Sequence, residues 1–340
     1  MKIPQNIILS RTDSIGDVVL SLPLAKVLKS HFPEMKIAFM GRSYTQPIIE
    51  SCIYVDEFIN LNDFLKREVL ICKKKPEAIL HVFPVSAIAK RAKQLYIPLR
   101  IGTTNRLYHW TTCNELIRLS RKKSDLHEAQ LNLKLLETFG IEKEFSLTEI
   151  GNLFGLEKLQ KISPALLTII KPNKYNLILH PKSQGSAREW GLDNFIALIN
   201  LLDTNKFNII ISGTAKEREL IQPIFDAVGD KVTDICGLMT LSEFISFIHH
   251  CDGLVANSTG PLHIAAALGK DAIGIYPPMR PIHPGRWAPL GPKAQVFVQH
   301  KECNDCKGND QACKCIMDMP PKLIYRALEE AQEQKSKASI

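Results

Sequence analysis

Residues 6–23 read NIILSRTDSIGDVVLSLP and pass from an apolar run, through a polar turn, to a second apolar run. We interpret residues 6–10 as a parallel strand buried on both faces, because such strands are apolar almost throughout. Gly16 permits the tight turn from this strand into a helix. The stretch therefore predicts the start of a doubly wound sheet. Asp17 is expected at the carboxyl end of the first strand, where such sheets bind ligands.

Strand-like and helix-like runs alternate in both halves of the chain, which is typical of βαβ units and a parallel sheet. Helix-like segments of the first half include residues 20–30 and 125–140, and residues 151–174 are the expected linker. The predicted fold class is α/β, with two doubly wound domains at residues 1–160 and 161–319. The expected strands are residues 6–10, 36–41, 78–83 and 99–102 in the first half and residues 176–180, 208–212, 253–257 and 272–276 in the second.

The composition is that of an ordinary globular protein of about two domains, with 340 residues of which 45% are hydrophobic and 23% charged. No apolar run reaches the roughly 18 residues that a membrane span needs, and the first residues lack the apolar core of a signal peptide. We therefore expect a cytoplasmic location, with the nine cysteines reduced. The net charge of +8 indicates an anionic partner, without distinguishing nucleic acid, phosphorylated lipid and nucleotide.

Asp17 has two interpretations from spacing alone. It could act chemically at the sheet edge, or Asp13, Ser14 or Asp17 could cap the following helix by accepting a free backbone N–H. The stretch contains neither the GxGxxG fingerprint of dinucleotide-binding folds nor a P-loop. A dinucleotide site or a Walker-type site is therefore not indicated.

A second stretch, VANSTGPLHIAAALGK at residues 255–270, also follows an apolar strand and opens a helix of small residues. Ser258, Thr259 and Gly260 would stand at the helix N-terminus, where free N–H groups and the helix dipole attract phosphate. His263 follows one turn later. The segment predicts a phosphate site, and the alternative is an ordinary Ser/Thr cap with a partly buried histidine.

Four motifs carry a resemblance to a known family. They are GDVVLSLPLAKVL at residues 16–28, LHEAQLNLKLLETFGI at 126–141, HPKSQGSAREW at 180–190 and NSTGPLHIAAALG at 257–269. In this order they resemble the heptosyltransferases of glycosyltransferase family 9. The resemblance implies a GT-B fold, in which two Rossmann-like domains face a central cleft, the first holding the acceptor and the second a nucleotide sugar. It also implies that the last helix, residues 320–340, packs back on the first domain.

The activity implied by the resemblance is inverting, metal-independent transfer of heptose from an ADP-heptose donor to the inner core of lipopolysaccharide. No Asp-x-Asp pair accompanies the expected diphosphate site, so no cofactor is expected beyond the ADP-sugar substrate. Two alternatives stay open. One is a family 9 transferase that uses another nucleotide sugar, and the other is a GT-B nucleotide-sugar-binding protein or epimerase without an external acceptor.

The resemblance also assigns roles to single residues. Asp17 takes the place of the aspartate in the family's Gly-Asp pair and becomes the expected catalytic base for the acceptor hydroxyl. Arg188 takes the place of a basic residue, commonly lysine, that stabilises the leaving diphosphate, and its planar fork suits a pair of phosphate oxygens. Ser183, in the same loop, is expected in the donor site. A solvated surface cation is the alternative for Arg188.

Other donor-site residues are carried over from the same resemblance. Glu217 matches an acidic residue that contacts the nucleotide through its ribose, although a glutamate in the first turn of a helix needs no such partner. Thr259, Gly260 and His263 match the donor-binding segment. Ser258 stands where several heptosyltransferases have aspartate. Because that aspartate belongs to the sugar-binding part of the site, the departure leaves the transferred sugar open.

Residues 84–123 contain nine Lys or Arg and one acidic residue, Glu115. This predicts contact with an anionic glycolipid acceptor, Kdo-lipid A or a heptosylated core, at the cytoplasmic face of the inner membrane. No nucleic-acid-binding motif accompanies the charge, and a solvated basic face is the alternative. The expected acceptor contacts are Arg11, Arg100 and Arg106, with Tyr96, Tyr108 and Trp110 against sugar rings or the membrane interface.

Cys303, Cys306, Cys313 and Cys315 form a C-x2-C-x6-C-x-C pattern near the end of the chain. Four thiolates could bind zinc in a tetrahedron. The last spacing is tighter than in zinc knuckles, so reduced thiols are the favoured interpretation, and structural zinc and disulfides are the alternatives.

Overall fold

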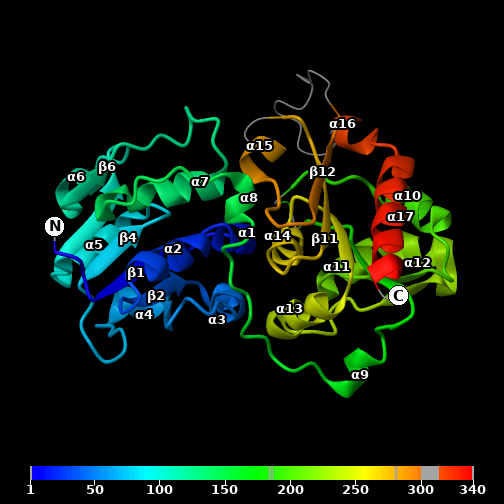
Figure 1. Ribbon diagram of the computed structural model, residues 1–340, viewed down its shortest axis with the longest axis horizontal. Helices are drawn as coiled ribbons and strands as arrows, with labels where there is room; N and C mark the ends of the chain where they lie inside the picture. Colours follow the sequence, from blue (N-terminus) through cyan, green and yellow to red (C-terminus); the bar gives the residue numbers. More distant parts are fainter. Residues whose placement is uncertain (1, 184, 186, 280–281, 300–313, 339–340) are drawn as a thin grey trace. The chain divides into compact units, whose positions relative to one another are not determined.

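The chain forms two compact units, Met1–Leu159 and Gln160–Ile340, in the computed structural model (Figure 1). The structure describes residues 2–183, 185, 187–279, 282–299 and 314–338. The division falls one residue before the boundary expected from the sequence. Each unit is a six-stranded sheet with helices, and the predicted α/β class with two parallel sheets is confirmed.

The sheet of the first unit has the strand order β3-β2-β1-β4-β5-β6, and all its neighbouring strands pair in parallel. Its central strand is buried along its whole length, which explains the apolar run of residues 6–10. The strands are β1 Asn6–Ser10, β2 Lys36–Gly41, β3 Glu57–Asn60, β4 Ala78–His81, β5 Leu99–Thr103 and β6 Glu115–Ile117.

The sheet of the second unit repeats this topology. Its order is β12-β11-β10-β7-β8-β9. If β7 is counted as the first strand of this unit, the order is 6-5-4-1-2-3, which is the order of the first sheet read from the other edge. This order is the doubly wound arrangement, in which ligands bind where the strand order reverses. The strands are β7 Tyr175–His180, β8 Phe207–Ile211, β9 Val232–Asp234, β10 Gly253–Asn257, β11 Asp271–Tyr276 and β12 Ala294–Val298.

The helices of the first unit are short, and several begin with recognisable signals. Pro23 starts one helix at a position where its missing N–H costs nothing, and Ser146 caps another through a capping box with Glu149. The helices are α1 Ile15–Val19, α2 Pro23–His31, α3 Gln46–Glu50, α4 Leu61–Lys66, α5 Ser86–Gln94, α6 His109–Thr112, α7 Glu128–Leu133 and α8 Leu147–Ile150, with 3-10 turns at Ser43–Thr45 and Lys134–Phe139.

The second unit begins in the expected linker, which contains one helical turn capped by Ser163. Among its described residues, as in the first unit, no helix is long and apolar enough to cross a bilayer. The helices are α9 Pro164–Leu167, α10 Leu192–Leu201, α11 Ala215–Leu220, α12 Gln222–Val228, α13 Leu241–His250, α14 Gly260–Ala267, α15 Pro284–Trp287, α16 Lys314–Met317 and α17 Pro321–Ala338, with a 3-10 turn at Gly229–Lys231.

The last helix differs from the expectation that it packs on the first domain. The structure packs α17 against α10, within the second unit (Figure 1). Ile324, Ala327, Leu328 and Ala331 form one apolar stripe of α17 and are buried in the core cluster of the second unit. This i, i+3, i+4, i+7 spacing gives the helix a single apolar face, and that face is already used against α10.

Candidate active site

Three of the motif loops leave the carboxyl ends of strands at the points where strand order reverses. β1 lies beside β4 in the first unit, and β7 lies beside β10 in the second. The loop after β1 leads to Asp17, the loop after β7 carries Ser183 and Arg188, and the loop after β10 carries Ser258 and Thr259. The topology thus places each motif at an edge where doubly wound sheets bind ligands.

Arg11 lies directly after β1 and is buried, with 2% of its side chain exposed. Its guanidinium donates to Asp13 at 2.7 Å, to Glu128 at 2.9 Å and to Asp17. Burial lowers the pKa of Arg11, but the carboxylates of Asp13, Asp17 and Glu128 outweigh that effect, and the pKa lies above its ordinary value. Arg11 is therefore a charged group held by three carboxylates.

Asp17 lies in the first turn of α1, with 15% of its side chain exposed. Its carboxylate accepts hydrogen bonds from the Arg11 guanidinium and from the Ser14 hydroxyl. The N-cap residue of α1, Ser14, makes no side-chain capping bond. The recorded contacts of the Asp17 carboxylate are with side chains, so they give no support to the helix-cap alternative.

Asp13 shares Arg11 with Asp17 but has a different electrostatic environment. Burial raises the pKa of Asp13 to about 6, and the negative charge of Asp17 adds to this rise, while Arg11 lowers it. Two carboxylates that share one cation in this way disfavour simultaneous ionisation. Asp13 therefore takes up a proton at a higher pH than an ordinary aspartate does.

The motif at residues 126–141 supplies partners that sequence reasoning did not assign. Glu128 accepts from Arg11 and, at 3.0 Å, from Arg121. Asn132 accepts from Arg121 at 2.9 Å and donates to the carbonyl of Leu20 at 3.1 Å. These contacts tie α7 to the loop after β1 and to the end of α1. The motif was visible in the sequence, but its partners Arg11 and Leu20 lie more than a hundred residues away.

The three arginines predicted to bind the acceptor are not brought together. Arg11 is occupied by carboxylates, and the guanidinium of Arg100 donates to the backbone carbonyls of Ile97 and Thr112. Arg106 is exposed in the loop between β5 and α6. For Arg11 and Arg100 the structure thus provides structural partners, and Arg106 is the one of the three that is exposed.

The loop from Pro181 to Trp190 is fastened at both ends. Asn257, at the end of β10, is fully buried; its amide accepts from the N–H of Trp190 at 2.9 Å and donates to the carbonyl of Pro181 at 2.9 Å. The indole of Trp190 is also fully buried and donates to the carbonyl of Met319 at 2.8 Å. Arg188 stands two residues before this anchor, so its backbone is fixed at the carboxyl edge of the sheet.

Ser183 and Glu189 hold the same loop together from inside. The hydroxyl of Ser183 donates to the carbonyl of Ala187 at 2.9 Å, and its backbone N–H donates to Glu189 at 3.0 Å. Glu189 also forms an ion pair with Lys182. Ser183 is buried, with 5% exposed, so its recorded contacts are those of a residue that shapes the loop.

Thr259 and Gly260 form the N-terminus of α14, a helix of eight residues. Thr259 is the N-cap residue but makes no side-chain capping bond, and its buried hydroxyl has no hydrogen-bond partner among the described residues. His263 lies in the first turn and is 4% exposed. Free N–H groups at such a terminus suit an anion. Ser258 is half-buried and hydrogen-bonds the hydroxyl of Tyr276.

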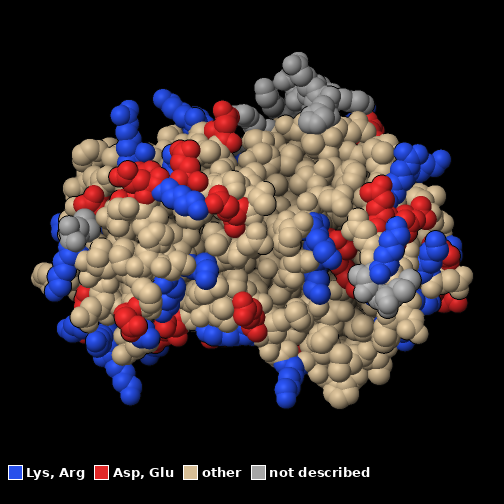
Figure 2. All heavy atoms as spheres, in the orientation of Figure 1, with Lys and Arg blue, Asp and Glu red and all other residues tan. Residues whose placement is uncertain are grey.

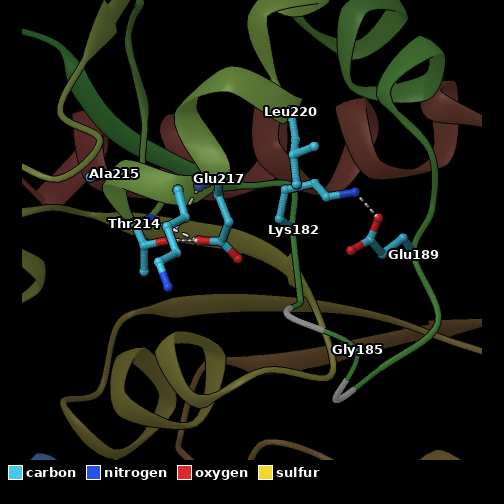
Figure 3. Close-up of a pocket in the computed structure, with 8 residues that line it drawn as sticks. Lys182, Gly185, Glu189, Thr214, Ala215, Glu217 and Leu220 are labelled. Atoms are coloured by element: carbon cyan, nitrogen blue, oxygen red, sulfur yellow. Dashed lines mark hydrogen bonds and ion pairs between the residues drawn. The ribbon is translucent and has the colours of Figure 1, made fainter.

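A pocket of about 660 Å³ lies in the second unit between the loop after β7 and the start of α11 (Figure 3). Thr214 and Glu217 form a capping box there, in which one carboxylate oxygen of Glu217 accepts from the N–H of Thr214 at 2.7 Å and from its hydroxyl at 2.9 Å. The other oxygen is buried without a partner among the described residues. The pocket is lined by Lys182, Gly185, Glu189, Thr214, Ala215, Lys216, Glu217 and Leu220.

The cysteine pattern near the end of the chain is only partly described. Cys303, Cys306 and Cys313 lie outside the described residues, and Cys315 is buried in the core cluster of the second unit. Within the described ranges, no group of three or more His, Cys, Asp or Glu side chains is arranged to hold a metal ion. The zinc alternative stays a prediction.

Comparison with known families settles the class of the protein. The family model described as glycosyltransferase family 9 (heptosyltransferase) matches residues 93–317, well over half of the chain. The chain belongs to glycosyltransferase family 9. It is therefore a glycosyltransferase, as the four sequence motifs predicted.

Relatives of this family 9 glycosyltransferase span nearly the whole chain. A putative glycosyltransferase of Haemophilus influenzae is 25% identical over 301 residues, which cover 84% of this chain and 86% of the relative. Lipooligosaccharide heptosyltransferase 2 of the same organism is 20% identical over 346 residues, covering 96% and 99%. The family 9 protein is thus similar to heptosyltransferases along its length.

Solved structures identify the fold of the family 9 protein. ADP-heptose lipopolysaccharide heptosyltransferase II of Escherichia coli matches with a TM-score of 0.74 at 18% identity, covering 97% of this chain and 99% of that one. A family 9 glycosyl transferase of Veillonella parvula matches with a TM-score of 0.79 at 17% identity, covering 98% and 99%. These similarities confirm the predicted GT-B class of fold.

Proposed function

We propose that this protein transfers heptose from ADP-heptose to the inner core of lipopolysaccharide, with inversion at the anomeric carbon and without a metal ion. The names of its relatives support the donor and acceptor class, since they include lipooligosaccharide heptosyltransferase 2 and lipopolysaccharide core heptosyltransferase of Haemophilus influenzae. The observation that carries the proposal is the junction of β7 and β10, where Asn257 fastens the Arg188 loop beside the N-terminus of α14.

In this proposal the donor diphosphate lies against Arg188 and the N–H groups of Thr259 and Gly260. A guanidinium and a helix N-terminus together neutralise the charge that develops on the departing diphosphate, which is the role that a metal ion has in other transferases. The unpartnered oxygen of Glu217 lines the neighbouring pocket and could accept hydrogen bonds from the ribose hydroxyls. A buried acceptor of this kind is costly unless a ligand satisfies it.

The acceptor hydroxyl is deprotonated by Asp17 in the proposed mechanism. As its oxygen bonds to the anomeric carbon, the bond from that carbon to the diphosphate breaks, the proton passes to the Asp17 carboxylate and ADP departs. A positioned base of this kind contributes about 10² to 10⁴ in rate. Arg11 and Ser14 fix the direction of the carboxylate through their hydrogen bonds to it.

Two features leave room for a different sugar or acceptor within the same class. Ser258 lacks the carboxylate that several heptosyltransferases have at this place, so a family 9 transferase with another nucleotide sugar is the second candidate. The acceptor is proposed to be an anionic glycolipid at a membrane surface, supported by the basic composition of residues 84–123. Kdo-lipid A and a heptosylated core are both compatible with that composition.

A thermal-shift panel of ADP-, GDP- and UDP-sugars tests the donor. A ligand present at about 100 times its Kd stabilises the fold by about 2.7 kcal/mol, so the true donor class is expected to stand out. Transfer is then measured by mass spectrometry on Kdo-lipid A and on a heptosylated core, with and without EDTA. Stabilisation by GDP- or UDP-sugars alone would show that ADP-heptose is not the donor. Activity that is lost in EDTA and restored by Mg²⁺ would refute metal independence.

A further inference from the structure

The most exposed large apolar side chains of the first unit gather in one short segment. Tyr96 is 88% exposed and Leu107 is 87% exposed, and Trp110 is 60% exposed. Tyr96 follows α5, Leu107 precedes α6, and Trp110 lies within α6. Lys93 joins the two helices by donating to the carbonyl of Thr111 at 2.8 Å. A single exposed leucine needs no explanation, but three large side chains on adjoining elements indicate a contact surface.

Local hydrogen bonds keep these side chains outside the core. His109 is fully buried, and its Nδ1 accepts from the N–H of Thr103 at 2.9 Å, which anchors α6 on β5. The indole N–H of the next residue, Trp110, donates to the carbonyl of Thr104 at 3.0 Å. The polar atom of Trp110 is thus satisfied while its ring faces solvent. Tyr96 has a left-handed backbone (φ 53°), which few non-glycine residues adopt.

The same part of the chain is rich in exposed basic residues. Lys90, Lys93, Arg106 and Arg118 are exposed, and so are Lys122 and Lys123. None of the six forms an ion pair with a carboxylate in the ranges that the structure describes. Figure 2 shows Lys and Arg side chains projecting beyond the surface of the first unit. An exposed tryptophan and leucine next to exposed basic side chains complement an anionic bilayer, where aromatic rings lie at headgroup level.

The position of this surface fits a lipid-linked acceptor. The loop that carries Arg106 and Leu107 starts at the carboxyl end of β5, and β5 lies two strands from β1 in the order β1-β4-β5. Two strand spacings are about 10 Å. Leu107 and the Thr104 carbonyl that holds the Trp110 indole therefore lie at the same sheet edge as the loop that carries Asp17, whereas Tyr96 precedes β5 and lies at the opposite edge.

We propose that Leu107 and Trp110, with Arg106 and Lys93 beside them in the chain or in the fold, form a docking surface for an anionic phospholipid bilayer. The proposal depends on the proposed function at one point only, the idea that the acceptor is anchored in the bilayer. The surface itself is defined by exposure and charge, so it can be tested without any transfer reaction.

Sedimentation of the full-length protein with vesicles tests the proposal. We expect binding to vesicles of phosphatidylethanolamine and phosphatidylglycerol, weakened by salt, and little binding to phosphatidylcholine alone. The double variant Leu107→Ser, Trp110→Ser is expected to bind at least about tenfold more weakly with an unchanged Tm. Trp110→Tyr keeps an amphipathic ring and should retain most of the binding. Leu238→Ser, at a leucine 61% exposed in the second unit, is the matched control and should bind normally.

Failure of the wild type to bind anionic vesicles would overturn the docking surface, as would normal binding by the double variant. If the double substitution instead abolishes self-association or binding of an oligonucleotide while vesicle binding is unchanged, the surface serves a second copy or nucleic acid and the proposal is wrong. Transfer to a water-soluble acceptor fragment separates the two proposals. Vesicle binding without any heptosyl transfer contradicts the proposed function alone, and transfer without vesicle binding contradicts the docking surface alone.

Discussion

Asn257 and Trp190, which are 67 residues apart in the chain, are joined by a hydrogen bond of 2.9 Å from the Trp190 backbone N–H to the Asn257 side-chain carbonyl. The same side chain donates to Pro181 at the other end of the loop. One buried amide therefore closes the Arg188 loop and places it against the strand that leads to Thr259. Both halves of the proposed diphosphate site depend on this single residue.

Replacing Asn257 by aspartate should detach the Arg188 loop from the strand that leads to Thr259. The carboxylate can still accept from Trp190, but it would face the carbonyl of Pro181 with no hydrogen to donate. We expect the free energy of unfolding to fall by about 1–3 kcal/mol and ADP affinity to fall about tenfold, measured by chemical unfolding and calorimetric titration.

The matched control for this change is Asn176→Asp. Asn176 is also buried and donates to the backbone, to Lys171 at 3.1 Å, but it lies in β7 at the opposite, amino-terminal edge of the same sheet. The Asn176→Asp variant should have a lower free energy of unfolding and an unchanged affinity for ADP. Equal ADP affinities in the Asn257 variant and the wild type, despite lower stability, would show that the loop is positioned without Asn257.

Asp17→Asn tests the proposed base. Asparagine has nearly the same shape: its carbonyl oxygen can accept from Arg11 and its NH2 group can donate to the Ser14 hydroxyl, so the fold should be retained. Because the amide cannot take the acceptor proton, kcat should fall by at least about 10² while the KM for the donor stays nearly constant. Asp13→Asn removes another carboxylate from the same arginine and is expected to have a much smaller effect. A transfer rate near that of the wild type in correctly folded Asp17→Asn protein would return Asp17 to a structural role.

Arg188→Ala should weaken ADP binding, because it removes the side-chain cation proposed to contact the diphosphate. Arg188→Lys keeps the charge but loses the two-pronged geometry, so it should recover part of the affinity. Arg218→Ala serves as control, since Arg218 is a cation of the same unit paired with Asp234. Calorimetric titration with ADP measures all three. If Arg188→Ala and Arg218→Ala bind ADP alike, Arg188 does not contact the diphosphate.

His81 predicts a pH dependence of stability in the first unit. It is fully buried at the end of β4, stacks on His109 with ring centroids 5.4 Å apart, and neither ring nitrogen has a hydrogen-bond partner among the described residues. Burial lowers the pKa of His81 to about 3, and the charges of His109 and Arg100 add to this effect. The unfolded imidazole takes up a proton near pH 6.5, whereas the folded one stays neutral until about pH 3.

The unfolded state therefore binds more protons below pH 6.5, and stability is lost as the pH falls from there towards 3. At pH 5 this single group should cost about 2 kcal/mol relative to neutral pH. In His81→Phe, the difference in unfolding free energy between pH 7 and pH 5 should shrink by that amount, measured by urea unfolding at both values. His250→Phe, at an exposed histidine, should leave the difference unchanged. An unaltered pH dependence in His81→Phe would mean that His81 is protonated in the folded protein.

The central strands could be predicted from the sequence because they are apolar and buried. The predicted bounds of β1, β2 and β10 agree with the structure to the residue. The edge strands β3, β6, β9 and β12 were not predicted, since all four are largely half-buried, and β3, β6 and β9 have only three or four residues, such as EFIN at residues 57–60. Strands of this kind are specified by the neighbour they pair with.

In the candidate site too, some features are set by a short stretch of sequence and others by contacts between residues far apart in the chain. The sheet-edge positions of Asp17 and Thr259 follow from a strand, a turn and a helix within one short stretch. The contacts of Arg11 with Glu128 and of Trp190 with Asn257 depend on tertiary pairing across 117 and 67 residues, which no local pattern encodes. Arg11 was for this reason expected to face the acceptor, although it is buried among carboxylates.

The placement of α17 in the core of the second unit has a consequence for the order of events on the ribosome. The first unit ends at Leu159, so all its parts have emerged while the second is still being made. The second unit lacks Ile324 and Leu328 until α17 is synthesised, and until Met319 is added its Trp190 lacks the carbonyl to which it donates. Domains fold as units during synthesis, beginning at the N-terminus. The Asp17 unit can thus fold cotranslationally, whereas the second unit cannot complete its core until α17 has been synthesised.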